Sequence, residues 1–330
     1  MLRSRLLSLP VLLVLGLVVA LVLPQTGWVS PYLQLVISYV GINMILAVSL
    51  NLVNGYMGEF SVGHAGFMAV GAYTASILTV WVFPREASPA LFPLALLAGG
   101  AVAAVAGLGL AFPSFKTRGD YLAIVTLAFL MIVKSVLENL PALGGPRGFM
   151  GMDRLTSLGW VFASVVFSVW LARNLVYSRW GRGVLSIRED ETAAGLVGVD
   201  TRRVKVVTFT VSAFLAGIAG GLFAHEIQFI NPRAFTLLKS TDMLVMVYLG
   251  GIGSLGGSLL GATVYTLVLE GLRPALQSVG IAQEWRLVFA PLLLILLMFT
   301  KPRGILGFRE LSFLRPRGER DGAKKGGEPR

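Results

Sequence analysis

The sequence predicts an all-α polytopic membrane protein with about 8–10 transmembrane helices, each matched to the thickness of a bilayer core. Three observations support this fold class. Apolar residues make up 55% of the chain and charged residues only 14%, whereas about a quarter of a soluble domain is charged. Mean hydropathy is +0.76. The charges are also clustered, which leaves apolar runs of roughly 20 residues, the length that crosses a bilayer.

Eight apolar runs each predict one span. The first follows Arg3 and Arg5 and could be a signal peptide, but the segment from Pro24 to Trp28 is a poor cleavage site. We therefore expect an uncleaved first span. The eight runs are 7–23, 33–53, 59–83, 90–112, 121–138, 158–176, 206–228 and 286–300.

The stretch 241–272 is too long for one ordinary span, and a glycine run at 250–257 interrupts it. Because glycine is unfavourable inside a helix, we expect two short helices, 241–250 and 258–272, that meet at a turn in or near the membrane. Backbone of this kind is tolerated at that depth only when it is buried in protein or lines a cavity. The run is not a phosphate loop, since it lacks a Gly-Lys-Ser/Thr ending and a preceding strand. The residues predicted to break the helix are Gly250, Gly251, Gly253, Gly256 and Gly257.

Basic residues set the predicted orientation. Counting the pair in 241–272 as two crossings gives ten, with both termini on one side. That side carries nineteen lysines and arginines and the other carries six. By the positive-inside rule, both termini and the loop 177–205 are expected in the cytoplasm. Re-entrant segments would also fit this bias.

The segment 51–67 gathers Asn, Glu, Ser, His and glycine where one apolar run gives way to the next. Polar residues at membrane depth are costly and indicate function, so a broken helix beside a translocation path is one interpretation. A short loop followed by a glycine-lined packing face is the other. Thr126 lies inside a later span, where it either faces the path or bonds its own helix. The candidate path residues are Asn54, Gly58, Ser61, Gly63, His64 and Thr126.

The segment 188–200 is a charged island between apolar stretches, so it must lie outside the bilayer. Its centre of Thr and Ala favours a short helix held against another protein. Cysteine is absent and the two histidines are far apart, so we expect no metal site and no catalytic residues. The net charge of +11 lies in loops and at the C-terminus, which argues against a nucleic-acid partner. No nucleotide-binding motif is present, so any ATP must be used by a partner, with no cofactor bound by this chain.

Several motifs in order resemble the LivM-type permease of bacterial branched-chain amino-acid ABC importers. They span 58–65, 118–129, 181–198, 250–257 and 301–307. The resemblance implies a permease domain over 1–308, in the bacterial inner membrane, followed by a basic cytoplasmic tail over 309–330. It also implies three kinds of partner besides the lipid bilayer: a homologous second permease, two cytoplasmic ATPases and an extracytoplasmic solute-binding protein.

The same resemblance makes the island the loop that docks on the ATPase. Its Glu-Ala-Ala-Gly character is matched, although Thr192 separates the Glu from the alanines. In the external glycine-rich loop, Arg147 stands where Asn is common. The expected docking residues are Glu189, Asp190, Glu191, Ala193, Ala194, Gly195 and Gly198.

The solute stays open at this stage. Relatives of this type carry leucine, isoleucine and valine, while similar permeases carry urea, short amides or other small solutes. An ion-coupled secondary transporter would need buried acids, for which only Glu59 and Glu138 are candidates. A channel or structural subunit would need no ATPase.

Overall fold

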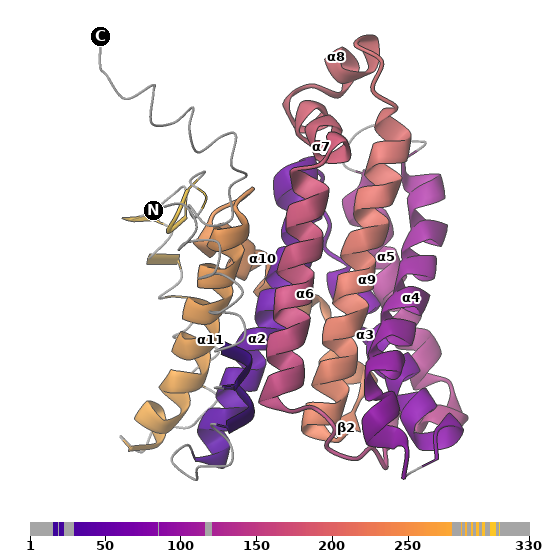
Figure 1. Cartoon of the computed structure of the whole chain (residues 1–330), viewed down its shortest axis with the longest axis vertical. Coiled ribbons are helices and arrows are strands. Elements are labelled where there is room, and N and C mark those ends of the chain that lie inside the picture. The colour runs from indigo at the N-terminus through magenta and orange to yellow at the C-terminus, as the bar shows by residue number, and fades with distance from the viewer. Residues whose placement is uncertain are drawn as a thin grey trace.

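A bundle of membrane-length helices makes up the computed structural model of the chain (Figure 1). It describes residues 30–84, 86–115 and 121–278, together with 304–307, Glu310 and single residues within 16–22 and 285–300. The expected spans 7–23 and 286–300 and the tail 309–330 therefore lie outside the continuously described ranges. Within those ranges, seven helical segments are long and apolar enough to cross a membrane: Pro31–Met57, His64–Val82, Ser88–Ser114, Tyr121–Glu138, Leu158–Val176, Thr201–Ile227 and Leu255–Pro274.

The described elements confirm the all-α prediction. The α-helices are α2 (Pro31–Asn51), α3 (His64–Ile77), α4 (Ser88–Ser114), α5 (Tyr121–Glu138), α6 (Leu158–Val176), α7 (Arg179–Glu189), α8 (Glu191–Leu196), α9 (Thr201–Ile227), α10 (Leu237–Gly250) and α11 (Leu255–Ser278). Two π-helices, η1 (Leu52–Met57) and η2 (Leu78–Val82), continue α2 and α3. Three short 3-10 helices are η3 (Pro141–Leu143), η4 (Gly145–Arg147) and η5 (Pro232–Ala234), and the strands are β1 (Phe149–Met150) and β2 (Phe229–Ile230).

Helix α9 is central to the bundle and packs against α2, α3 and α4. Small residues allow this close approach. A Cβ added at Gly71 of α3 would lie 2.2 Å from the backbone oxygen of Gly217 of α9. One added at Gly220 would lie 2.0 Å from the oxygen of Met68. Small residues at such interfaces let the backbones of membrane helices meet, where the hydrophobic effect supplies no net attraction.

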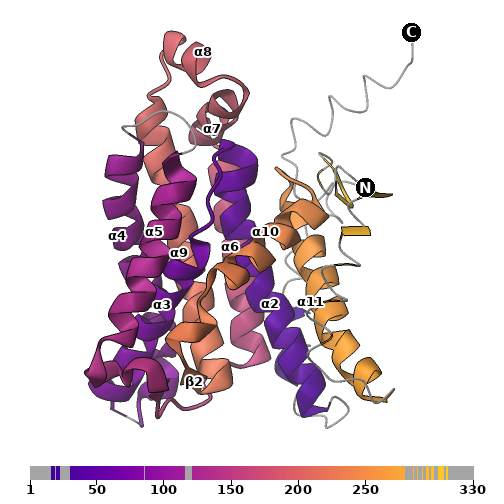
Figure 2. The same cartoon turned by 180° about the vertical axis from the view of Figure 1, so that it is seen from behind.

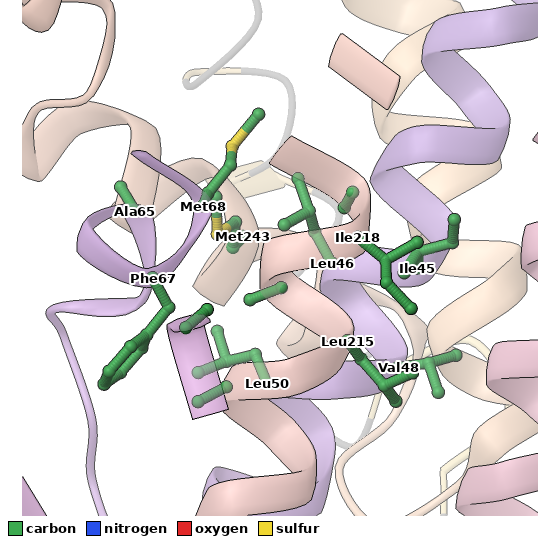
Figure 3. Close-up of a cluster of buried hydrophobic side chains, with 14 of the residues drawn as sticks. Ile45, Leu46, Val48, Leu50, Ala65, Phe67, Met68, Leu215, Ile218 and Met243 are labelled. Atoms are coloured by element: carbon green, nitrogen blue, oxygen red, sulfur yellow. The ribbon is translucent and has the colours of Figure 1, made fainter. Parts of the chain in front are cut away.

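Buried apolar side chains from four helices fill the centre of the bundle (Figure 3). Leu46 from α2, Phe67 from α3, Leu215 from α9 and Met243 from α10 are all at most 1% exposed. The Phe67 ring also stacks on Phe129 of α5, with ring centroids 4.7 Å apart. The polar segments described below begin and end next to this core.

The two ends of the bundle differ in what covers them (Figures 1 and 2). At one end, α7 lies beyond the end of α6 and beside the start of α9, and α8 projects furthest from the bundle. At the other end, β1 and β2 pair antiparallel and join the loops before α6 and α10. An ion pair of 2.6 Å between Arg154 and Glu226 ties this second end to α9.

The expected helix break near 250–257 is present but shorter than predicted. Helix α10 ends at Gly250, and α11 begins at Leu255 and is long enough to cross a membrane. The prediction of a short helix over 258–272 is therefore wrong. Gly256 and Gly257 belong to the first turn of α11, where Gly257 instead allows close packing: a Cβ there would lie 2.8 Å from the oxygen of Gly250.

Candidate functional site

Side-chain caps begin the helices in and beside the charged island, α7, α8 and α9. Ser178 accepts from the backbone N–H of Gly181 at the start of α7. The Asp190 carboxylate caps α8 by accepting from Thr192 (2.8 Å) and Ala193 (2.9 Å). Asp200 caps α9 through the N–H of Arg203 at 3.0 Å. Such caps satisfy N–H groups that have no partner within the helix, so they stabilise the start of each of these helices.

The tip of the island presents apolar side chains outside the bundle. Leu196 is 85% exposed and Val197 is 78% exposed. A Cβ added at the neighbouring Gly195 would meet nothing within 4 Å. Because this tip lies beyond the ends of the membrane-length helices, lipid does not explain its apolar character (Figure 1). This exposed apolar tip is a candidate site for a contact with another protein.

Two interruptions of the membrane helices lie side by side near the island. The first break is residues 58–63, between η1 and α3, and the second break is residues 251–254, between α10 and α11. Asn51, at the end of α2, joins the second break to the helix that leads into the first. Its Nδ2 donates to Ser254 O (2.9 Å) and Ser258 Oγ (2.7 Å), and its Oδ1 accepts from Gly253 N (2.9 Å).

Arg188, in the last turn of α7, contacts both breaks. Its Nη1 donates to the backbone oxygen of Gly55 at 3.4 Å. A Cβ added at Gly58, which has a φ of +77°, would lie 2.9 Å from Arg188 Cγ. A Cβ added at Gly253 would lie 3.0 Å from Arg188 Nη1. One side chain of the island therefore lies against the ends of both interrupted segments.

Most of the predicted path residues gather around the first break, deep in the bundle. Asn54 Oδ1 accepts from Ser61 N at 3.3 Å, and Thr126 Oγ1 accepts from Val62 N at 3.2 Å. Ser49 Oγ lies 2.8 Å from His64 Nε2. Ser61 Oγ and His64 Nδ1 are buried, and neither has a hydrogen-bond partner among the described residues.

Gly63 is part of the same cluster, because a Cβ there would lie 1.8 Å from the backbone oxygen of Thr126. Gly58 is not, since it lies at the Arg188 contact instead. Thr126 bonds its own helix as predicted, by donating to Ala123 O at 3.1 Å, and it also accepts from the first break; that it faces a path stays a prediction.

Comparison with known proteins decides the family. The model of the family described as "Branched-chain amino acid transport system / permease component" matches residues 32–298. The chain belongs to this family. It is 33% identical to the high-affinity branched-chain amino acid transport system permease protein LivM of Escherichia coli (strain K12), over 80% of this chain and 68% of that protein.

Two further likenesses accompany this permease family. The permease protein LivH of Escherichia coli (strain K12) is 26% identical, over 81% of this chain and 92% of that protein. A solved structure of an inward-facing metal-chelate type ABC transporter matches with a TM-score of 0.47 and 17% identity. That match covers 90% of this chain and 99% of the other.

The structure of the island differs from the sequence prediction at two places. Ala194 was predicted to dock, but it is 3% exposed and packs in the core of this chain, so it is not available to a partner as placed here. Leu196 and Val197, which were not predicted, are the most exposed apolar residues of the island. An apolar pair at the end of a short helix in a polar island was a signal that could have identified them.

Asn51 and Arg188 were also not predicted as site residues. Asn51 was visible as a polar residue just before the glycine-containing segment 55–66, and Arg188 as the first charge of the island. Their importance arises from contacts between positions more than 130 residues apart in the chain, 51 with 253 and 188 with 55. No local spacing in the sequence carries that information.

Proposed function

We propose that this chain is the membrane-spanning permease subunit of an ATP-driven importer of branched-chain amino acids. The chain's family and its relatives' function support the solute class. The 33% identity to LivM extends over 80% of this chain, and the family match over residues 32–298 includes both helix breaks. Urea, short amides or another small solute carried by the same machinery is the alternative. Uptake of radiolabelled leucine, valine and urea by the reconstituted importer distinguishes them: leucine and valine uptake is expected, and uptake of urea alone would contradict the proposal.

In this proposal α8 docks on a cytoplasmic ATPase, with Leu196 and Val197 as its apolar contacts and Glu189, Glu191, Ala193, Gly195 and Gly198 around them. The carrying observation is the exposed Leu196–Val197 pair on a capped helix that projects from the bundle. ATP is then bound and hydrolysed by two partner ATPases, and this chain binds no cofactor. Both termini are cytoplasmic, on the same side as α8, in agreement with the distribution of basic residues.

The opposite end of the bundle is proposed to receive an extracytoplasmic solute-binding protein. Its support is the ordered surface formed by β1, β2 and the loops around them, which Asn231 strengthens by donating to Pro146 O at 3.2 Å. Arg147 lies exposed on this surface. A homologous second permease completes the complex. The 26% identity to LivH, itself a permease protein, supports such pairing between related chains.

Docking is tested by co-purification of the ATPase with permease variants. Leu196→Asp places a charge in the proposed apolar contact, so ATPase co-purification and solute-stimulated hydrolysis should fall at least tenfold. Leu196→Met, which keeps size and apolarity, serves as the matched control and should retain both. Normal ATPase binding by Leu196→Asp would contradict docking through this surface.

A further inference from the structure

Lys205 lies at a meeting point of three chain segments. It is in the second turn of α9 and is only 6% exposed. Its Nζ is 2.5 Å from Oε1 of Glu59, in the first break, and 2.8 Å from Oε2 of Glu191, the first residue of α8. The ammonium group also lies 5.8 Å from the centre of the Phe115 ring at the end of α4. A single cation thus connects the island and the first break to one of the central helices of the bundle.

A nearly buried lysine is costly unless it is paired, so Lys205 holds its partners firmly. The two carboxylates are not equivalent. The side chain of Glu59 is 21% exposed and that of Glu191 is 47% exposed. Glu59 is therefore the sheltered partner, and Glu191 is the partner nearer to water and to any protein that contacts α8. Breaking such a pair from one side leaves a nearly buried charge uncompensated, which is strongly unfavourable.

Local structure does not account for either carboxylate. Helix α8 is already capped by Asp190, so Glu191 is not needed there to satisfy backbone N–H groups. The other hydrogen bonds between the first break and side chains of the described residues are longer: Ser61 N donates to Asn54 Oδ1 (3.3 Å), Asn54 Nδ2 to Ser61 O (3.5 Å) and Val62 N to Thr126 Oγ1 (3.2 Å). A backbone bond from Glu59 N to Val53 O at 3.1 Å adds to them. Glu59 makes the shortest side-chain contact of this segment, and it makes it to the same cation as the island.

We propose that Lys205 is a positioning residue that passes displacement of α8 to the first break through Glu191 and Glu59. When a partner shifts α8, Glu191 moves relative to Lys205, and the balance of the two ion pairs changes. Glu59 then changes position, and the rest of the first break, which includes Ser61, moves with it relative to His64. This proposal rests on the proposed function, because it supplies the link between the docking helix and the polar segment deep in the bundle.

The test uses the whole importer reconstituted in liposomes, with ATP hydrolysis and leucine uptake measured on the same vesicles. Lys205→Gln removes the cation, and Glu59→Gln removes the sheltered partner while leaving Lys205 paired with Glu191. Both variants should bind the ATPase normally and keep basal hydrolysis, while leucine taken up per ATP falls at least fivefold. Lys205→Arg restores the charge and should recover most of the ratio. Arg202→Gln, which removes an exposed charge three residues away on the same helix, is the matched control and should leave the ratio unchanged.

Each outcome decides the proposal separately from the docking proposal. An unchanged uptake-to-hydrolysis ratio in Glu59→Gln overturns it, and so does an equal loss in Arg202→Gln. If Lys205→Gln fails to fold, Glu59→Gln still gives the answer, since its lysine remains paired. Loss of ATPase binding in Glu59→Gln would also overturn a purely internal role. Failure of docking through Leu196, by contrast, would appear as normal ATPase binding in Leu196→Asp, whatever the ratio in the Glu59 variant.

Discussion

The two helix breaks lie side by side but are held in opposite ways. In the second break, Asn51 makes three hydrogen bonds, and the carboxylate of Glu310 accepts from the N–H groups of Leu255 and Gly256 at 2.8 Å each. Backbone bonds from Ile305 and Leu306 to the end of α10 add to these. In the first break, buried Ser61 keeps a polar atom without a partner among the described residues, and so does His64, the first residue of α3 just after the break.

This difference separates an anchor from a segment suited to change. Polar atoms buried without partners are costly, so an arrangement that gave them partners would lower the free energy of this segment. The second break is hydrogen-bonded both to Asn51 and to Glu310, so a movement would break these bonds and raise its free energy. We therefore expect α10 and α11 to keep their junction while residues 58–63 shift, and the following variants test that contrast.

The largest expected effect is on the anchor. Asn51→Leu keeps a buried side chain of similar size but leaves Gly253 N, Ser254 O and Ser258 Oγ without that partner. Ser254 O and Ser258 Oγ remain bonded to each other, whereas Gly253 N loses its partner among the described residues. Stability should therefore fall by about 2–3 kcal/mol, the upper part of the range of about 1–3 kcal/mol for a buried polar group left unpaired, because two further bonds are lost with it. The midpoint of thermal unfolding of the purified permease in detergent measures the change.

Asn43→Leu is the matched control for this prediction. Asn43 lies on the same helix and makes one hydrogen bond of 2.9 Å, to Thr266 of α11. Its loss should lower the midpoint by clearly less than Asn51→Leu does. Equal shifts for the two variants would mean that the second break is no special anchor.

A smaller effect is expected at Glu310. Its carboxylate lies at the N-terminus of α11, where a negative charge and two accepted hydrogen bonds stabilise the helix. Glu310→Ala should lower stability by about 1 kcal/mol, measured by the same unfolding midpoint. Glu310→Asp, with the charge kept on a shorter side chain, should lose less. An Ala variant as stable as the parent would remove Glu310 from the anchor.

The smallest effect on stability is expected in the first break. Ser61 Oγ has no hydrogen-bond partner among the described residues, so Ser61→Ala should change stability by no more than about 0.5 kcal/mol in either direction. Leucine uptake should nevertheless fall severalfold if this hydroxyl finds its partner during transport. Normal uptake together with normal stability would show that the hydroxyl takes no part in the path.

Much of the fold followed from composition and local pattern. Apolar runs located the membrane helices because spanning a bilayer requires that length, and glycine at 250–253 correctly indicated an interruption. The extent of α11 was missed because glycine was treated as a helix breaker at 256 and 257. At Gly257 the missing side chain instead lets the start of the helix pack closely on Gly250 and Gly251.

The site was only partly predictable for a similar reason. Polar residues of 54–64 could be identified as unusual at membrane depth, and they do lie together with Thr126. Their link to the island could not be identified, because Lys205 pairs with a residue 146 positions earlier in the chain. The burial of Ala194 could not be predicted either, since it depends on how α8 packs on α7 and α9.

The most direct test of the central claim compares the movement of the two breaks. The chain contains no cysteine, so introduced pairs can be spin-labelled without further changes. Phe60→Cys with Phe112→Cys reports the first break against α4, and Ile252→Cys with Phe112→Cys reports the second. Distances are measured by pulsed electron paramagnetic resonance in the assembled importer, without nucleotide and with ATP trapped. The account predicts that the 60–112 distance distribution shifts while the 252–112 distribution stays in place. A shift confined to 252–112, or equal shifts in both pairs, would contradict it.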